Sequence, residues 1–198
     1  MSPSTKTEQL RAIKEAVVNL TISPLYTYRQ AENNLPVIGE GSHEAKIMLI
    51  GEAPGKNEAK TGRPFCGAAG RLLDELLASI NLPREKIYIT NIIKDRPPQN
   101  RDPLPEEINI YGPFLDRQIE IIKPAIIATL GRYAMTYILA KFGVGDLGTI
   151  SQLHGQVVVV EASYGPIKIV PLYHPAAAIY NQHLKSTLLA DFKILTTV

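Results

Sequence analysis

Cysteine is almost absent from this chain, because Cys66 is the single one among 198 residues. One thiol excludes an intramolecular disulfide and a metal site built from several cysteines of the same chain. Long apolar runs are lacking as well: stretches such as 47–50 and 125–130 are far shorter than the roughly 20 residues of a membrane span. The first ten residues, MSPSTKTEQL, hold no apolar signal core. We therefore expect a soluble, cytoplasmic protein with no membrane partner.

A strong charge of either sign is also lacking. The chain carries 21 Lys and Arg against 19 Asp and Glu, a net charge of +2, and a balance this even does not indicate a nucleic-acid partner. Only the local placement of basic residues can do so. The apolar share of 45% and the charged share of 20% are typical of a globular protein. The length fits one domain, which we expect over residues 1–198 with residues 1–7 frayed.

Short apolar runs alternate with amphipathic stretches along most of the chain. This alternation is typical of a mainly parallel sheet that helices cover on both faces. We therefore predict the α/β class: a three-layer α/β/α sandwich around a central, mainly parallel sheet of four to five strands. The predicted strands are 46–50, 86–93, 125–130, 156–160 and 167–171, and the predicted helices are 8–19, 68–80, 106–122, 131–141 and 184–195.

Binding sites in such sheets form at the carboxyl ends of the strands. Four loops are predicted at that edge: 51–67, 91–105, 143–155 and 172–183. The residues of these loops are therefore the first candidates for function.

The first loop, 51–67, reads GEAPGKNEAKTGRPFCG. Its glycines and prolines bring the backbone close to whatever binds at the strand end. Glu52 and Glu58 supply carboxylates, and Phe65 lies on a stretch too polar to be core. No Gly-Lys-Ser/Thr follows, so this is not a phosphate loop of the Walker type. A plain strand-to-helix turn remains the alternative, with Glu58 as an ordinary surface residue.

The second loop begins at Asn91, where a strand is about to end. Its amide offers a donor and an acceptor in fixed geometry. Lys94, Arg96 and Arg101 follow on a stiff, proline-rich segment, where a basic cluster can hold phosphates. Both features also have a simpler interpretation, namely an asparagine that caps its own loop and basic residues that face solvent.

The last loop contains His174 directly before Pro175. A lone histidine is more often structural than catalytic. Its tip, with Ala177, Ile179 and Tyr180, is apolar, so it either plugs into the core or wedges between base pairs. Together the loops bring an aromatic ring, an amide and a histidine to one edge of the sheet. Such groups can stack on, recognise and protonate a planar heterocycle.

Four segments resemble the uracil-DNA glycosylase superfamily, and within it family 4, the iron–sulfur class of bacteria and archaea. They are residues 51–55 (GEAPG), 61–65 (TGRPF), 90–98 (TNIIKDRPP) and the His-Pro pair at 174–175. Their order and spacing agree with the family pattern, and the resemblance extends from about residue 8 to the end of the chain.

The resemblance implies a role for each pocket residue. Phe65 would stack on a flipped uracil. Asn91 would recognise its edge, with the amide nitrogen donating to O4 and the amide oxygen accepting from N3–H. His174 would donate to O2 and stabilise the negative charge of the departing base. Glu58 would lie against C5 and exclude the methyl group of thymine.

The resemblance also implies residues for water and for DNA. Gly51, Glu52 and Ala53 would border the base and the attacking water, and Asn100 would hold that water. For contact with DNA we nominate the basic residues of the second loop and the apolar tip of the last one: Lys94, Arg96, Arg101, Ala177, Ile179 and Tyr180.

One departure from the family concerns its cofactor. Family 4 holds a [4Fe–4S] cluster with four cysteines, at positions that correspond to Leu20, Ser23, Asp95 and Tyr111 here. None of these is a thiol, Cys66 lies elsewhere, and cluster ligation requires cysteine. We therefore expect no cofactor and no metal. We expect an apolar contact between Leu20 and Tyr111 to fill the gap.

The leading hypothesis is a monofunctional DNA repair enzyme of the base excision type that hydrolyses the N-glycosidic bond of uracil in DNA and leaves an abasic site. One alternative is a glycosylase for another deaminated base, hypoxanthine or xanthine. Another is a damaged-DNA-binding module with weak turnover. A nucleotide-binding α/β domain is the fourth, and the missing phosphate loop weighs against it. We expect a monomer, since the DNA face must stay open.

Overall fold

Within residues 4–145, 148–179 and 181–197, which a computed structural model describes, six strands form a single sheet in the order β1-β3-β2-β4-β6-β5. Strands β3, β2, β4 and β6 run parallel, and the edge strands β1 and β5 pair antiparallel with their neighbours. The predicted α/β class and mainly parallel sheet are therefore confirmed. The strands are β1 Glu40–Gly41, β2 Ile47–Gly51, β3 Tyr88–Asn91, β4 Ile126–Leu130, β5 Val158–Ala162 and β6 Gly165–Leu172.

The prediction of four to five strands missed β1, a short strand at the sheet edge. It pairs Glu40 with Ile89 and Gly41 with Tyr88. Gly41 has a φ of 122°, and a Cβ there would lie 1.9 Å from the carbonyl oxygen of Ile87, so only glycine fits this close approach. Two residues are too few to show a hydrophobic pattern, and nothing in the sequence marks this strand.

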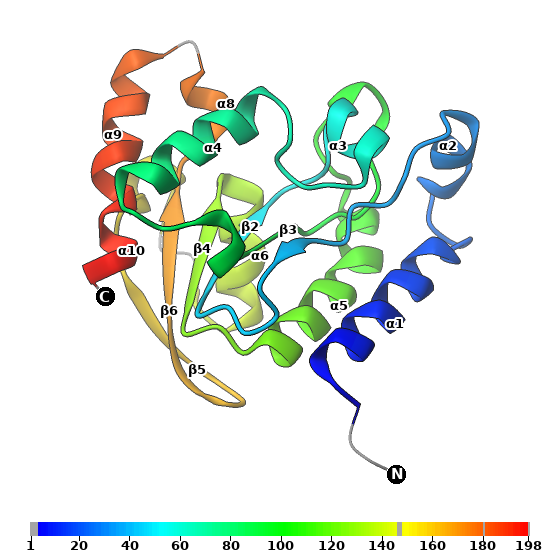
Figure 1. Cartoon of the computed structure of the whole chain (residues 1–198), viewed down its shortest axis with the longest axis horizontal. Helices are drawn as coiled ribbons and strands as arrows, with labels where there is room; N and C mark the ends of the chain where they lie inside the picture. Colours follow the sequence, from blue (N-terminus) through cyan, green and yellow to red (C-terminus); the bar gives the residue numbers. More distant parts are fainter. Residues whose placement is uncertain (1–3, 146–147, 180, 198) are drawn as a thin grey trace.

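Helices cover both faces of the sheet and complete the predicted three layers (Figure 1). On one face, α1, α5 and α6 pack against Met48, Ile50 and Ile127. On the other, α4 and α9 pack against Leu49 and Ala128. Successive residues of a strand point to opposite faces. A strand that is covered on both faces must therefore be apolar throughout, and this is why the central strands read as continuous apolar runs.

The predicted helices are present with slightly shifted ends, except that the last one, 184–195, is divided into α9 and α10. Four further α-helices, α2, α3, α7 and α8, lie inside segments that were not predicted to be helical. The α-helices are α1 Lys6–Val18, α2 Tyr26–Ala31, α3 Lys56–Thr61, α4 Ala68–Ser79, α5 Pro105–Ile122, α6 Arg132–Lys141, α7 Ile150–Leu153, α8 Pro175–Ala178, α9 Gln182–Phe192 and α10 Ile194–Thr197, and the 3-10 helices are η1 Arg84–Lys86 and η2 Pro98–Asn100.

α1 begins at Lys6, so residues 6 and 7 of the stretch that we expected to fray are helical, whereas residues 1–3 lie outside the described part of the chain. Thr5 caps this helix: its Oγ1 accepts from the Glu8 backbone N–H at 3.2 Å, and Glu8 Oε2 accepts from the Thr5 N–H at 2.7 Å. This reciprocal pair is a capping box. None of the described helices combines the length and the apolar character that crossing a membrane requires.

Candidate active site

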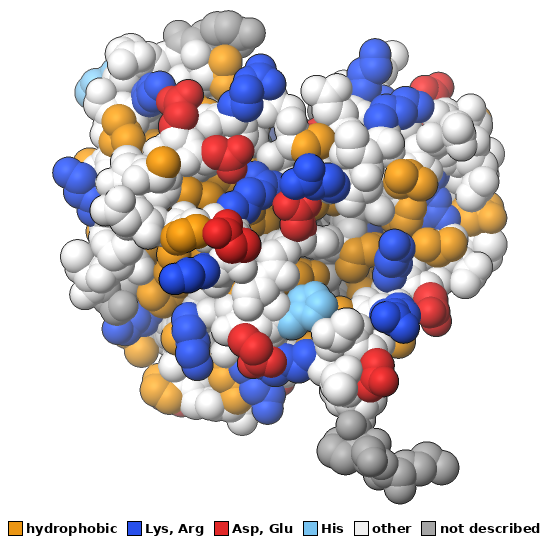
Figure 2. Space-filling view, in the orientation of Figure 1, with side chains coloured by type: hydrophobic (Ala, Val, Ile, Leu, Met, Phe, Trp, Pro, Cys, Tyr) orange, Lys and Arg blue, Asp and Glu red, His pale blue; other side chains and the backbone are white. Residues whose placement is uncertain are grey.

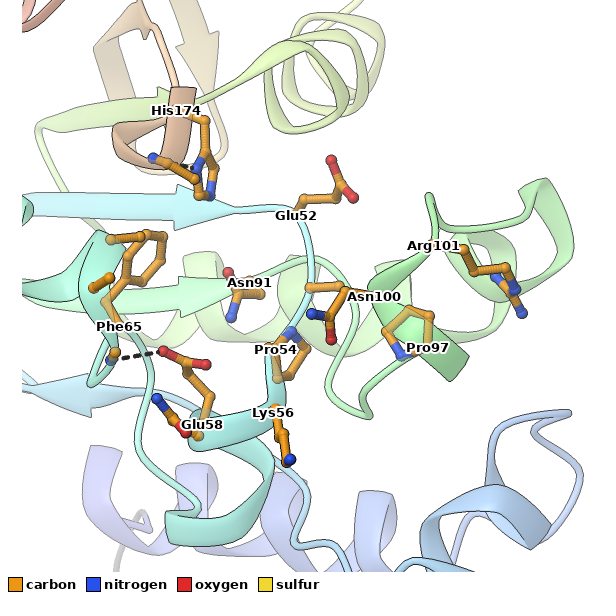
Figure 3. A pocket seen from close by; sticks show the side chains of 17 residues that line it. Glu52, Pro54, Lys56, Glu58, Phe65, Asn91, Pro97, Asn100, Arg101 and His174 are labelled. Atoms are coloured by element: carbon orange, nitrogen blue, oxygen red, sulfur yellow. Dashed lines mark hydrogen bonds between the residues drawn. The ribbon is translucent and has the colours of Figure 1, made fainter. Parts of the chain in front are cut away.

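A cavity of about 610 Å³ lies at the carboxyl ends of the parallel strands. In the space-filling view of Figure 2, the upper edge of the molecule is notched between the side that carries α4 and the side that carries α3. Figure 3 shows Phe65, Asn91 and His174 around one end of the cavity, and Arg101 at the other. Asn91 ends β3, Phe65 precedes α4, and His174 follows β6. The fold thus brings the three residues on which the sequence prediction depends to one cavity.

Phe65 has an unusual backbone that aims its ring into this cavity. Its φ is 48°, a value that costs energy for any residue other than glycine. The Arg84 guanidinium holds this turn by donating to the carbonyl oxygens of Phe65, at 3.1 Å, and of Pro64. Gly70 on α4 leaves room for the same carbonyl, because a Cβ there would lie 1.8 Å from the Phe65 oxygen. The ring position is therefore set by its neighbours.

Asn91 lies beside Gly51, its register partner across β2 and β3. A Cβ at Gly51 would lie 2.3 Å from Asn91 Oδ1 and 2.8 Å from Phe65 Cζ, so glycine allows the amide and the ring to approach each other. Asn91 is only 1% exposed, and its Nδ2 has no hydrogen-bond partner within the described part of the chain. A buried donor without a partner is costly unless a ligand accepts from it.

His174 has a defined tautomer when it is neutral. Its Nδ1 accepts from the Ala176 backbone N–H at 3.1 Å, which leaves Nε2 to carry the proton. Burial lowers the His174 pKa to about 4, and the charge of Glu58 opposes this shift only in part. The imidazole is therefore neutral at pH 7. Its ring lies 5.6 Å from the ring of Phe65, with 28° between the two planes.

Glu58 on α3 is half-buried and fixed by the backbone that follows Phe65. Its Oε1 accepts from the N–H groups of Cys66 at 3.1 Å and Gly67 at 3.0 Å. Figure 3 shows the carboxylate below Asn91 and Phe65, with one of these contacts dashed. Glu58 is thus not the ordinary surface residue of our alternative interpretation. It joins α3 to the start of α4 and lines the cavity.

Glu52 lines the cavity beside a group of polar residues that the sequence analysis missed. Burial and then the charge of Asp102 raise the Glu52 pKa to about 7, and Arg132 lowers it in part. Asp102 Oδ2 accepts from Arg132 at 2.6 Å and from the Tyr133 hydroxyl at 2.8 Å. Arg132 and Tyr133 open α6, directly after β4 ends at Leu130. The end of that predicted strand was the signal that could have identified them.

One of the four loops predicted at this edge does not line the cavity. Among the described residues of 143–155 none contributes to its wall, because this segment follows α6 instead of a parallel strand. It forms α7 and carries His154, whose Nδ1 lies 2.8 Å from Asp191 Oδ2 on α9. The turn after β4 does not line the cavity either, but it brings Arg132 and Tyr133 close to Glu52.

Lys94 requires a correction, because it is fully buried and cannot reach a DNA phosphate. Its Nζ donates to Thr90 Oγ1 at 2.8 Å, to the Asn91 carbonyl oxygen at 2.6 Å and to Gln118 Oε1 at 2.6 Å. Burial lowers its pKa well below the usual value. Lys94 thus joins the end of β3 to α5 and supports the backbone of Asn91.

The other two basic residues of this loop are engaged within the protein but remain accessible. Arg96 donates to Asn100 Oδ1 at 2.7 Å and to the Tyr28 hydroxyl at 3.4 Å. Arg101 binds both oxygens of Glu107, at 2.9 and 2.6 Å, with 37% of its side chain exposed. On the face shown in Figure 2, basic and acidic side chains are interspersed, as the small net charge implies.

The apolar tip of the last loop divides into two parts. Ala177 on α8 is exposed, whereas Ile179 is half-buried and packs against the core beneath α4 and α9. Tyr180 lies outside the described residues. Of the two alternatives for this tip, Ile179 follows the first and plugs into the core. Ala53, Ala176 and Pro97 line the cavity, and the sequence analysis missed the last two.

The residues at the family's cluster positions do not fit an iron–sulfur cluster. Ser23 and Asp95 present oxygens, and Tyr111 a phenol, where a cluster requires thiolates. Ser23 Oγ lies 2.7 Å from the Tyr111 hydroxyl, which donates to Asp95 Oδ2 at 2.6 Å, so these atoms are already engaged with one another. Leu20 is half-buried and packs against the core that contains Tyr111. Hydrogen bonds among Ser23, Tyr111 and Asp95 therefore lie where we predicted only an apolar contact between Leu20 and Tyr111.

Comparison with known proteins gives a consistent result. The model of the uracil DNA glycosylase superfamily matches residues 38–193. A protein of Sulfurisphaera tokodaii named Type-4 uracil-DNA glycosylase is 46% identical over 94% of this chain and 83% of its own length. A protein of the same name from Archaeoglobus fulgidus is 48% identical over 79% of this chain and 78% of its own. A Type-5 uracil-DNA glycosylase of Thermus thermophilus is 33% identical over 54% of this chain and 56% of its own.

The superfamily match spans most of the chain and includes the cavity residues from Glu52 to Ala176. The type-4 relatives resemble it over most of both lengths, and the resemblance seen in the sequence motifs is thus confirmed. This chain belongs to the uracil-DNA glycosylase superfamily.

Proposed function

We propose that this chain is a monofunctional uracil-DNA glycosylase, which hydrolyses the N-glycosidic bond of uracil in DNA and leaves an abasic site. The observation that carries the proposal is the convergence of three groups on one cavity: the Phe65 ring, the Asn91 Nδ2, which no described residue pairs with, and the neutral His174. Such a site must accept a flipped nucleotide, because the target bond is out of reach within a duplex.

Uracil is selected at the Phe65 end of the cavity. The base lies on the Phe65 ring, Asn91 Nδ2 donates to O4, and Asn91 Oδ1 accepts from N3–H. Cytosine presents the opposite donor and acceptor at these two positions, so buried groups would remain unpaired. The Glu58 carboxylate, held by the backbone of Cys66 and Gly67, lies beside C5 and leaves no room for the thymine methyl group.

The departing base is stabilised by His174. As the bond between C1′ and N1 breaks, its electron pair moves into the base and negative charge builds on O2. The Nε2–H of the neutral imidazole donates to O2 at this stage, and the bond to Ala176 keeps the proton on Nε2. A donor that is already in place stabilises the transition state without reorganisation.

The sugar side of the reaction requires water and negative charge. Asn100 Oδ1 is engaged by Arg96, so the Asn100 amide N–H group is left to orient the attacking water. Glu52 accepts the proton that this water loses as its oxygen bonds to C1′, and its carboxylate stabilises the electron-poor sugar. Lys56 lines the cavity but points away from Phe65 and Asn91 in Figure 3, which favours water over a lysine adduct.

A nicking assay tests the proposed function. Single- and double-stranded oligonucleotides that contain uracil, hypoxanthine or xanthine are incubated with the protein, and abasic sites are then cleaved with alkali. We expect product from uracil alone. Product from the purines alone would favour a glycosylase for another deaminated base. Retention on a gel without product would favour a damage-binding module.

We expect the rate to rise with pH through about 7, where Glu52 ionises. Glu52→Gln should lower kcat by roughly 10²-fold at pH 8 and remove this step from the profile, because the amide cannot accept a proton. The measurement is a single-turnover rate at pH values from 5.5 to 8.5. A variant that keeps the same step would show that another group titrates.

The same substitution tests how the raised Glu52 pKa affects the stability of the fold. Burial favours the protonated form of Glu52, so this side chain stabilises the fold below the unfolded value of 4.5, and that stability is lost as the pH rises through about 7. We therefore expect the Tm of the wild type to fall relative to that of Glu52→Gln between pH 5 and pH 8. Parallel Tm curves for the two proteins would contradict this assignment.

A further inference from the structure

Arg29 completes the buried network that occupies the cluster positions. Its Nη1 donates to both oxygens of Asp95, at 3.1 and 3.0 Å, and to the Val17 carbonyl oxygen at 3.0 Å, while Nη2 donates to the Val18 oxygen at 2.5 Å. The side chains of Arg29 and Asp95 are 3% and 0% exposed. Val17 and Val18 end α1, where carbonyl groups lack helical donors and a cation is favourable.

The network joins segments that are far apart in the sequence. Arg29 on α2 binds the end of α1 and Asp95, which follows β3. Asp95 accepts from Tyr111 in the middle of α5, and the Tyr111 hydroxyl meets Ser23 between α1 and α2. Ser23 is 4% and Tyr111 0% exposed. The N-terminal helices are thereby fastened to the loop that follows Asn91.

A second set of contacts continues from this network to the cavity. Tyr28, adjacent to Arg29 on α2, accepts from Arg96, and Arg96 in turn holds Asn100. Gln99 and Asn100 both have positive φ values, of 55° and 54°. A backbone of this kind is costly outside glycine and persists only where its surroundings hold it. The 95–101 segment therefore requires an anchor at its start.

We propose that the Arg29–Asp95–Tyr111–Ser23 network takes the place of a metal cluster in this chain by cross-linking the N-terminal helices to the loop that follows Asn91. Within this network, Arg29 and Asp95 are positioning residues, which hold segment 95–101 so that Asn100 faces the cavity. The positioning role rests on the proposed function, whereas the cross-link does not. The oxygen atoms at these positions do not suit an iron–sulfur cluster. An ion pair and its hydrogen bonds hold the segments together instead.

A buried ion pair has the property that such a cross-link requires. Removing one partner leaves an unpaired buried charge, which is strongly destabilising, so the segments hold together or separate as a unit. Here the pair is also bound to its surroundings: Asp95 accepts hydrogen bonds from Arg29 and Tyr111, and Arg29 also donates to the end of α1. The network requires neither iron nor sulfide.

The first measurement concerns iron. The protein is produced in iron-supplemented medium under anaerobic conditions, and its iron content and visible absorbance are determined. We expect no stoichiometric iron, and the same Tm before and after treatment with a chelator. Bound iron whose removal lowers the Tm would overturn the proposal.

The second measurement separates positioning from folding. Asp95→Asn should lower the Tm by about 10 °C, because it leaves Arg29 buried without a charged partner. It should also lower kcat for a uracil oligonucleotide roughly tenfold, with KM changed less than threefold, when both are measured well below the Tm, because a displaced Asn100 no longer orients the attacking water. The double variant Arg29→Met/Asp95→Asn should recover part of the lost Tm, since no buried charge remains. Glu44→Gln, which breaks the exposed Lys6–Glu44 pair, is the control and should change neither quantity.

A lower Tm with an unchanged kcat would overturn the positioning role. A Tm shift no larger than that of Glu44→Gln would overturn the cross-link. If the wild type removes no uracil at all, the proposed function fails, and the iron and Tm results still decide whether the network serves as the cross-link.

Discussion

Asn91→Leu should lower kcat/KM for uracil in DNA by about 10³-fold and remove most of the preference for uracil over cytosine. Leucine keeps the volume of this buried side chain but takes away the donor to O4 and the acceptor from N3–H. Asn91 lines the cavity, is 1% exposed, and its Nδ2 has no partner among the described residues, so this donor is available to a ligand there. The measurement is a single-turnover rate on matched oligonucleotides with uracil or cytosine.

Asn34→Leu provides a matched control. Asn34 is also a buried asparagine, 9% exposed, and neither polar atom of its side chain has a partner in the described structure. It does not line the cavity. We expect this variant to remove uracil at the rate of the wild type. If Asn91→Leu also keeps its rate and its selectivity, the assignment of the base-recognition group is wrong.

His174→Leu should lower kcat by about 10²- to 10³-fold with KM changed less than threefold, because the role proposed for His174 is to stabilise charge that is present only in the transition state. The defect should be the same at pH 6 and pH 8, since the wild-type imidazole has a pKa of about 4 and is neutral at both values. Rates with saturating enzyme at the two pH values test both statements.

His154→Asn is the corresponding control. His154 is half-buried at the same side of the sheet, with Asp191 at 2.8 Å and the Tyr173 ring at 4.7 Å, but it does not line the cavity. We expect it to affect stability more than kcat. An equal loss of kcat in both histidine variants would show that the His174 effect is an indirect consequence of a disturbed fold.

Secondary structure was predicted correctly where a residue pattern has a single physical meaning. The continuous apolar runs of β2 and β4 predicted strands covered on both faces, and the structure confirms this. The prediction failed on short elements. α2 and α3 are each only six residues long, and helices of that length depend on tertiary contacts, such as those of Arg29, more than on propensity.

The candidate site shows the same division. Phe65, Asn91 and His174 could be nominated because each lies at or after the end of a predicted strand, in loops that share one edge of a parallel sheet. Lys94 was nominated by the same reasoning and is buried. The charge of a lysine predicts contact with solvent or phosphate. The Nζ of Lys94 instead donates to three acceptors in the interior. A one-dimensional pattern does not reveal which acceptors will surround a cation.

The order of amino acids alone was thus sufficient for the α/β class, the edge of the sheet that carries the cavity, the cavity residues in the loops after three strands, and the lack of cluster thiols. These follow from apolar periodicity and residue identity, which are local properties. The polar network at Arg29 and Asp95, the group around Asp102, and the burial of Lys94 emerged only with the folded chain. Each joins side chains that are distant in sequence, and the geometry that pairs them arises from how the helices pack on the sheet.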